Sequence, residues 1–294
     1  MSISVIGGGK WGQALHFAFS KNNTSLITSR SKKEISNFVD TKTALASKYL
    51  VFAMPAQTIG DWLKENFKDN GQKVLVASKG IEVKSGKFLN EIFAEYIPQD
   101  RLSYLSGPSF ASEVIQALPT AVVISSTNRT LAREFSNFFP NFMKTYLSDD
   151  IVGAEVCGAY KNVIAIASGV CDGLKLGNNA RASLISRGLV EMQRFGYVFG
   201  AKSDTFLGLS GAGDLFLTAS STLSRNFRVG IALAQKKTLE EILGEIGEVA
   251  EGVYTSTAIN ILAKERDIYT PIAREVELII KGKNPLQSLN DLMS

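Results

Sequence analysis

The chain has 294 residues, of which 45% are hydrophobic, and this is enough to bury the cores of two domains. Its 32 Lys and Arg against 28 Asp and Glu leave a net charge of +4 without any basic run, which argues against nucleic-acid binding. No secretion signal is recognisable, and the longest apolar stretch, residues 163–171, is far shorter than the ~20 residues that cross a bilayer. We therefore expect a cytoplasmic protein without an integral membrane segment.

A glycine triplet follows the first predicted strand, residues 2–6. Gly7, Gly9 and Gly12 form a G-x-G-x-x-G pattern, in which the glycines permit a tight turn, the approach of a pyrophosphate and close packing of the next helix. The helical pattern 13–19 would direct its free N–H groups at a bound diphosphate. A plain glycine-rich turn would also contain such a triplet, but the flanking strand and helix favour a dinucleotide site.

The first half of the chain alternates predicted strands and helices, as parallel sheets do. Strands are expected over residues 2–6, 25–29, 49–54, 74–77, 102–105 and 121–125, with helices over 58–67 and 87–96 between several of them. The pattern predicts an α/β fold with an N-terminal Rossmann-type, doubly wound sheet. Its ligand crevice should lie beyond the carboxyl ends of the strands, where polar or turn-rich segments converge: 7–12, Arg30, 54–55, 78–80 and 106–109.

After residues 146–150 the strand pattern stops, and the rest of the chain reads as helix, including residues 227–235 and 272–281. We therefore predict a dinucleotide-binding domain over 1–150 and an all-α substrate and catalytic domain over 151–294. The substrate should bind between them.

Residues 151–174 predict a buried helix, because the segment is apolar and rich in glycine and alanine. Lys161 lies within it and, at helical spacing, shares a face with small side chains: Ala154, Cys157, Gly158, Ala165 and Ser168. Burial can lower the pKa of a lysine by several units, which suits proton transfer near neutral pH. The alternative is a lysine whose ammonium reaches solvent.

Few other side chains could act as acid or ligand. His16 is the only histidine, and its place on the first predicted helix favours a structural role. Cys157 and Cys171 would lie about 21 Å apart on one helix, too far for a disulfide. One histidine and two distant cysteines offer no zinc site, so no metal is expected.

Three polar segments in the second half have both a structural and a functional interpretation. Asp214 follows a glycine-rich turn and could simply cap a helix. Ser224, Arg225 and Asn226 open a predicted helix and could bind phosphate, although an ordinary serine N-cap would look similar. Residues 249–252 form an acidic turn that in isolation suggests a helix connection.

Taken in chain order, seven motifs resemble those of the bacterial NAD(P)-dependent glycerol-3-phosphate dehydrogenases, over residues 3 to about 285: 7–12 with Trp11, 78–82, 106–111, 159–165, 211–215, 224–226 and 249–252. The resemblance implies a helical second domain like that of 6-phosphogluconate dehydrogenase. It also implies reversible reduction of dihydroxyacetone phosphate to sn-glycerol 3-phosphate, a precursor of glycerophospholipids.

The resemblance also implies roles for individual residues. Lys161 is similar to the family's catalytic proton donor and acceptor, with Asn162 and Asp214 holding the reacting oxygen or its neighbour. The implied substrate-binding residues are Lys79, Gly107, Ser109, Lys161, Asp214, Ser224, Arg225 and Asn226. With the glycine triplet, the implied cofactor-binding residues are Gly7, Gly9, Trp11, Gly12, Arg30, Lys79, Ala111, Arg225, Val249 and Glu251.

The cofactor is NADP or NAD. Arg30 ends the second predicted strand, where an NAD-specific fold often has an acid, and an arginine there can bind the 2′-phosphate of NADP. The interpretation favours NADPH, although Arg30 could equally be a solvated loop charge. Between Arg30 and Tyr49 the chain lacks a longer insert that many relatives carry, so contacts made by that insert are not expected here.

Two other functions remain open at this stage. One is a related dehydrogenase acting on a 3-hydroxy acid, such as 6-phosphogluconate or pantoate. The other is a redox sensor that binds NADP without turnover, because a Rossmann domain alone requires only binding. Lys161 argues against the sensor, which has no use for a buried acid or base. A homodimer is possible.

Overall fold

The computed structural model describes residues 2–247 and 250–293. Its N-terminal half contains one seven-stranded sheet in the order β2-β1-β3-β4-β5-β6-β7. The strands are β1 (Ser2–Ile6), β2 (Thr24–Thr28), β3 (Tyr49–Phe52), β4 (Lys73–Val76), β5 (Leu102–Ser106), β6 (Thr120–Ser125) and β7 (Met143–Ser148). The six strands expected from the sequence are therefore confirmed, with ends shifted by one or two residues.

Two features of the sheet differ from the sequence prediction. Strand β6 pairs antiparallel to β5, because the connection between them contains only the five-residue helix α5 (Ala111–Ile115), too short to run back along a strand of about 17 Å. Strand β7 lies in a segment that the sequence analysis did not assign to the sheet. It is a half-exposed edge strand, so it lacks the continuous apolar run of the inner strands.

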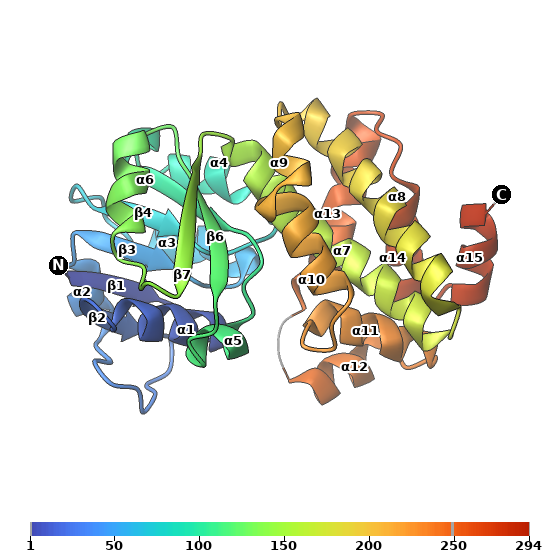
Figure 1. The fold of residues 1–294 in the computed structure, drawn as a ribbon, viewed down its shortest axis with the longest axis horizontal. Coiled ribbons are helices and arrows are strands. Elements are labelled where there is room, and N and C mark those ends of the chain that lie inside the picture. Colours follow the sequence, from blue (N-terminus) through green and yellow to red (C-terminus); the bar gives the residue numbers. More distant parts are fainter. Residues whose placement is uncertain (1, 248–249, 294) are drawn as a thin grey trace.

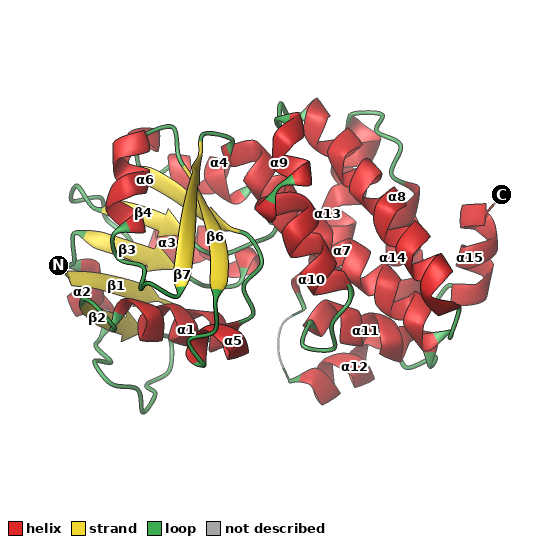
Figure 2. Ribbon diagram, viewed as in Figure 1, coloured by secondary structure: helices red, strands yellow, loops and turns green. Residues whose placement is uncertain are grey.

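Helices cover both faces of the sheet (Figure 2). Side chains of α1 (Lys10–Phe19) and α6 (Arg129–Ser136) pack in one apolar cluster with the sheet. Side chains of α2 (Thr41–Leu45), α3 (Ala56–Asn66) and α4 (Leu89–Ala94) pack in another. A 3₁₀ turn, Gln99–Arg101, precedes β5. The doubly wound Rossmann-type architecture is therefore confirmed.

The described residues of the C-terminal half form helices joined by turns and loops (Figure 1). Helix α7 (Ile151–Gly173) runs through its centre and contacts most of the others. These are α8 (Gly177–Val198), α9 (Ser203–Leu207), α10 (Asp214–Ala219), α11 (Arg225–Ala234), α12 (Leu239–Ile246), α13 (Glu251–Glu265), α14 (Pro271–Ile280) and α15 (Pro285–Met293). A π-helical turn, Leu209–Gly213, leads into α10.

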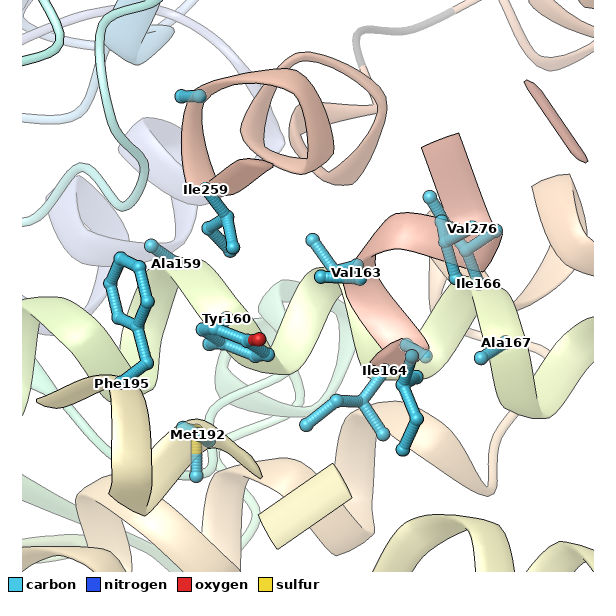
Figure 3. Close-up of a cluster of buried hydrophobic side chains, with 14 of the residues drawn as sticks. Ala159, Tyr160, Val163, Ile164, Ile166, Ala167, Met192, Phe195, Ile259 and Val276 are labelled. Atoms are coloured by element: carbon cyan, nitrogen blue, oxygen red, sulfur yellow. The ribbon is translucent and has the colours of Figure 1, made fainter. Parts of the chain in front are cut away.

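Helix α7 is the core of the helical half, which confirms the buried helix predicted over residues 151–174. Figure 3 shows Tyr160, Val163 and Ile164 of α7 surrounded by side chains of α8, α13 and α14, among them Met192, Phe195, Ile259 and Val276. By length and composition α7 could cross a membrane, but 94% of its most apolar window is buried inside the protein. Its hydrophobicity therefore serves the core of this domain.

Candidate active site

A cleft of about 560 Å³ lies between the carboxyl ends of the sheet strands and the helical half. Eleven residues that the sequence analysis assigned to cofactor or substrate line it: Gly9, Trp11, Lys79, Ser109, Ala111, Lys161, Asn162, Ser224, Arg225, Asn226 and Glu251. These residues are contributed by both halves of the chain. The cleft is therefore the place where a dinucleotide and a second molecule can meet.

The glycine turn has the geometry that a diphosphate requires. Gly7 has a φ of +121°, and a Cβ on Gly12 would lie 1.8 Å from the Gly7 oxygen, so α1 packs directly on the turn. Gly9 caps α1 without a side-chain hydrogen bond, and a Cβ there would meet nothing within 4 Å. The first N–H groups of α1 therefore face open space in the cleft, and the turn fits the dinucleotide expected from the sequence.

Lys161 is buried, with only 7% of its surface exposed where it lines the cleft, so its ammonium is not the solvated group that the alternative interpretation allowed. Its Nζ donates to Asp214 Oδ1 at 2.5 Å and to Thr218 Oγ1 at 3.1 Å. Burial lowers the pKa of Lys161 to about 8; Asp214 opposes this shift and Lys79 adds to it. Lys161 can therefore both donate and accept a proton near neutral pH.

Asp214 joins the two halves of the site. Its Oδ2 accepts a hydrogen bond from Lys79 Nζ at 2.7 Å, while its Oδ1 accepts from Lys161. Burial alone would raise the pKa of Asp214, but the two lysines outweigh it and hold the pKa below its usual range. Asp214 begins α10 after the π-helical turn, and its carboxylate binds the two lysines instead of capping the helix.

Two asparagines connect the helices beside Lys161. Asn226 Nδ2 donates to Asn162 Oδ1 at 3.0 Å, and Asn226 Oδ1 accepts the Gly252 N–H at 3.0 Å. These bonds join α7, α11 and α13 at the floor of the cleft, because each residue belongs to a different helix. Both asparagine side chains are therefore held at fixed orientations next to the buried lysine.

The start of α11 points into the cleft. Ser224 is its N-cap, with Oγ accepting the Phe227 N–H at 3.3 Å, and it also lines the cleft with Arg225. Ser224 therefore both caps α11 and is available to contact a bound phosphate. A helix N-terminus combined with an arginine is a suitable site for a phosphate group.

Glu251 reaches across the cleft from the start of α13. Its Oε1 accepts the N–H of Ala56, the first residue of α3, at 3.1 Å. Burial raises the pKa of Glu251 to about 7. Val249, the other cofactor residue expected here, lies outside the described residues.

Gly107, Arg30 and His16 are not among the residues that line the cleft. Gly107 contributes its carbonyl oxygen, which accepts from Lys79 Nζ at 3.4 Å and from Ser109 Oγ at 3.2 Å. Arg30 is exposed, two residues beyond the end of β2. His16 is buried on α1 with Nδ1 2.9 Å from Ser25 Oγ, as its expected structural role requires.

Several cleft residues had no individual role in the sequence analysis, although it placed segments 7–12 and 54–55 at the crevice. Lys10 and Arg228 add positive charge to the lining, and Met54, Pro55 and Phe110 add apolar surface. Arg228 lies one helical turn after Arg225, so the spacing of the two arginines on the predicted helix was the available signal. For the apolar residues the sequence carried no signal beyond their place after strand ends.

Comparison with known proteins agrees with this geometry. Family models of the NAD-dependent glycerol-3-phosphate dehydrogenases match residues 21–132 (N-terminus) and residues 150–291 (C-terminus). This chain belongs to that family. Glycerol-3-phosphate dehydrogenase [NAD(P)+] of Campylobacter lari is 63% identical over 294 residues, covering 100% of this chain and 98% of the relative. The enzyme of the same name from a Nitratiruptor species is 61% identical over 293 residues, with the same coverage.

Solved structures place the chain in the same dehydrogenase family. The glycerol-3-phosphate dehydrogenase of Coxiella burnetii superposes with a TM-score of 0.92 at 30% identity, covering 100% of this chain and 98% of that one. D-mandelate dehydrogenase superposes with a TM-score of 0.61 at 12% identity, covering 99% of each chain, and shares the fold alone. The Rossmann-type and helical arrangement of this dehydrogenase is therefore confirmed.

Proposed function

We propose that this chain is an NAD(P)-dependent glycerol-3-phosphate dehydrogenase that reversibly reduces dihydroxyacetone phosphate to sn-glycerol 3-phosphate. The observation that carries the proposal is the buried Lys161–Asp214 pair, whose lysine lines the same cleft as Gly9 of the glycine turn and the start of α11. The pair provides an acid and base, the turn fits the dinucleotide, and the helix start fits the substrate phosphate.

A nicotinamide dinucleotide held at the glycine turn would supply the hydride chemistry at C2 of the substrate, and the residues of this chain would move the proton. In the reducing direction Lys161 Nζ donates its proton to the C2 oxygen, which would otherwise become an alkoxide. Asp214 holds the ammonium through a 2.5 Å hydrogen bond and stays ionised. In the oxidising direction neutral Lys161 removes the hydroxyl proton.

The start of α11 would hold the substrate phosphate, with Ser224, Arg225 and Asn226 closest to it. Anchoring a group that does not react orients the carbonyl carbon toward Lys161 and the nicotinamide. We also propose that Lys79, Gly107, Ser109 and Asp214 contact the substrate. The residues proposed to contact the cofactor are Gly7, Gly9, Trp11, Gly12, Arg30, Lys79, Ala111, Arg225, Val249 and Glu251.

We also propose the division at residue 150, a cytoplasmic location and a homodimer. The division is supported by the end of β7 at Ser148 and the start of α7 at Ile151. Since sn-glycerol 3-phosphate is the backbone of glycerophospholipids, the product would enter lipid synthesis.

An absorbance assay at the nicotinamide band tests the activity. The protein is mixed with dihydroxyacetone phosphate and either NADH or NADPH, and the loss of reduced cofactor is followed. Oxidation of the cofactor that requires dihydroxyacetone phosphate supports the proposal. Tight cofactor binding without turnover would instead support the sensor, and turnover only with a 3-hydroxy acid or its keto form would support the related dehydrogenase.

A further inference from the structure

Glu155 is a buried carboxyl group of α7 that the proposed mechanism leaves without a role. Only 8% of its surface is exposed, and its Oε2 accepts a hydrogen bond from the backbone N–H of Asn90 at 2.7 Å. Asn90 is the second residue of α4, which belongs to the sheet half of the protein. The side chain of the central helix therefore caps a helix of the opposite domain.

The segment that leads into α4 also carries Lys79. This connecting segment, residues 77–88, leaves the end of β4 and reaches α4 at Leu89. The aliphatic part of Lys79 lies against α7, because a Cβ on Gly158 would be 3.3 Å from Lys79 Cγ. Lys79 Nζ then reaches Asp214 at 2.7 Å.

The connecting segment is thus attached to α7 near both of its ends. Lys79 crosses Gly158 at one end, and Asn90, just beyond the other end, is bound by Glu155. Glu155, Gly158 and Lys161 follow one another at three-residue intervals, so neighbouring members of this row are about 60° apart around α7 and one turn apart along it. Lys79 covers Gly158, and Lys161 lies one helical turn further along α7.

Phe88 strengthens the same attachment. It ends the connecting segment and belongs to the apolar cluster of the helical half, where its ring packs edge-on against Phe199 with centroids 5.3 Å apart. The hydrogen bond from Asn90 to Glu155 therefore lies beside apolar contacts at a partly buried place, where an unpaired Asn90 N–H would be only partly hydrated.

We propose that Glu155 is a positioning residue: by binding the start of α4, it holds Lys79 at the distance from α7 at which Lys79 and Lys161 share Asp214. This inference rests on the proposed function and names a further residue for the same site. It predicts that loss of the Glu155 bond lets Lys79 withdraw from Asp214. Lys161 then loses a nearby positive charge, gains Asp214 for itself, and its pKa rises.

The test compares Glu155→Ala and Glu155→Gln with the wild type. Because burial raises the pKa of Glu155 to about 8, its carboxyl group is mostly protonated at pH 7, and the amide of glutamine can replace it as an acceptor. The pKa of Lys161 is measured by pH-dependent acylation of its side chain, followed by mass spectrometry, and kcat is measured separately. We expect Glu155→Ala to raise the pKa of Lys161 by at least about half a unit and to lower kcat about tenfold. Glu155→Gln should behave as the wild type in both measurements at pH 7.

Glu191→Ala is the matched control. Glu191 is a buried carboxyl group of α8 that accepts the N–H groups of Ile272 and Ala273 at the start of α14 and the O–H of Tyr160 on α7, so all its partners lie within the helical half. Its loss should lower Tm as Glu155→Ala does but leave the pKa of Lys161 in place. An equal pKa shift in both variants, or none in Glu155→Ala, would overturn the positioning role.

The same experiments also cover two other results: a Glu155→Ala variant that does not fold, and a wild type that is inactive on dihydroxyacetone phosphate. If Glu155→Ala does not fold, Glu155→Asp takes its place, since its shorter side chain draws the acceptor away from Asn90; the inference then requires a smaller rise in the pKa of Lys161, and an unchanged pKa contradicts it. If the wild type lacks activity on dihydroxyacetone phosphate, the proposed function fails. The acylation measurement still decides the role of Glu155, because it does not depend on turnover.

Discussion

Lys79 and Lys161 bind opposite oxygens of the same carboxylate, Asp214, from different domains. Lys79 Nζ lies 2.7 Å from Oδ2, and Lys161 Nζ lies 2.5 Å from Oδ1. One carboxylate cannot neutralise two ammonium groups, so the more deeply buried lysine gives up its proton more easily. Lys161 is that lysine, with 9% of its side chain exposed against 19% for Lys79. The site therefore stores a proton that can be transferred near neutral pH.

Replacement of Lys161 tests whether this residue donates the proton in the reaction. Lys161→Ala should fold and bind NADPH almost normally but lower kcat at least about a hundredfold, the usual scale for loss of a general acid. Lys161→Arg should also be inactive, because guanidinium does not release its proton at neutral pH. Steady-state kinetics and cofactor titration measure both effects, with the exposed Lys144→Ala on β7 as the control. Near-normal turnover of Lys161→Ala would contradict the assignment of Lys161 as the general acid and base.

The pH dependence should have opposite signs in the two directions. Because the pKa of Lys161 is about 8, reduction requires the protonated form and kcat should fall as pH rises through 8. Oxidation of sn-glycerol 3-phosphate requires the neutral form, so its kcat should rise over the same range. Rates measured from about pH 6 to about pH 10 in both directions check this. The same sign in both would contradict a single acid and base.

The sequence predicted the glycine turn and Lys161 because both depend on local pattern. Gly7, Gly9 and Gly12 stand between an apolar strand and a helix, and Lys161 lies in an apolar, small-residue segment. The Lys79–Asp214 contact depends instead on how two domains pack over 135 positions of sequence, for which periodicity carries no signal. Glu155 was missed for the same reason: its partner is a backbone N–H of another domain.

The antiparallel orientation of β6 could not be predicted from the local sequence pattern either. Apolar runs identify a strand but not its orientation, which is decided here by the short connection through α5. Strand β7 was missed because an edge strand keeps polar residues on its exposed side. Both strands lie at the end of the sheet farthest from the glycine turn in strand order, so the predicted position of the dinucleotide was unaffected.

Arg30 should select between the two cofactors. It is exposed just after β2, where the ribose 2′ position of a dinucleotide is expected. Arg30→Ala should raise the KM for NADPH about tenfold and leave the KM for NADH nearly unchanged, because only NADPH loses a charge-assisted phosphate contact. The exposed Arg129→Ala on α6 is the control for net charge. Equal effects on both cofactors would show that Arg30 does not bind the 2′-phosphate.

Glu155 should also make folding stability depend on pH. Its pKa of about 8 in the folded protein exceeds the ordinary value of 4.5, chiefly through burial, with Glu91 adding to the shift and hydrogen bonds from the start of α4 opposing it. The folded state then binds the extra proton between these two values, so the contribution of Glu155 to stability is fully present below pH 4.5 and is lost as pH rises through 8. Between about pH 6 and about pH 8 the loss should be about 2 kcal/mol. Urea unfolding of Glu155→Gln should lack this part of the slope; an unchanged slope would exclude Glu155 as its source.

The last prediction concerns the substrate phosphate, which the start of α11 is proposed to hold. Ser224 caps this helix beside Arg225, and both line the cleft that contains Lys161. Binding energy from a phosphate that does not react can orient the carbonyl, so its loss should lower turnover as well as affinity. Dihydroxyacetone should therefore be a very poor substrate of the wild type.

Arg225→Ala should narrow the gap between the two compounds by lowering kcat/KM for dihydroxyacetone phosphate alone. The comparison is made at saturating cofactor, because Arg225 is also assigned to cofactor binding, and cofactor affinity is measured separately. An equal loss for both compounds would assign Arg225 to the cofactor only. Similar kcat/KM values for both compounds in the wild type would contradict the phosphate anchor and favour a hydroxy-acid substrate, because a carboxylate-binding site has no requirement for the phosphate group.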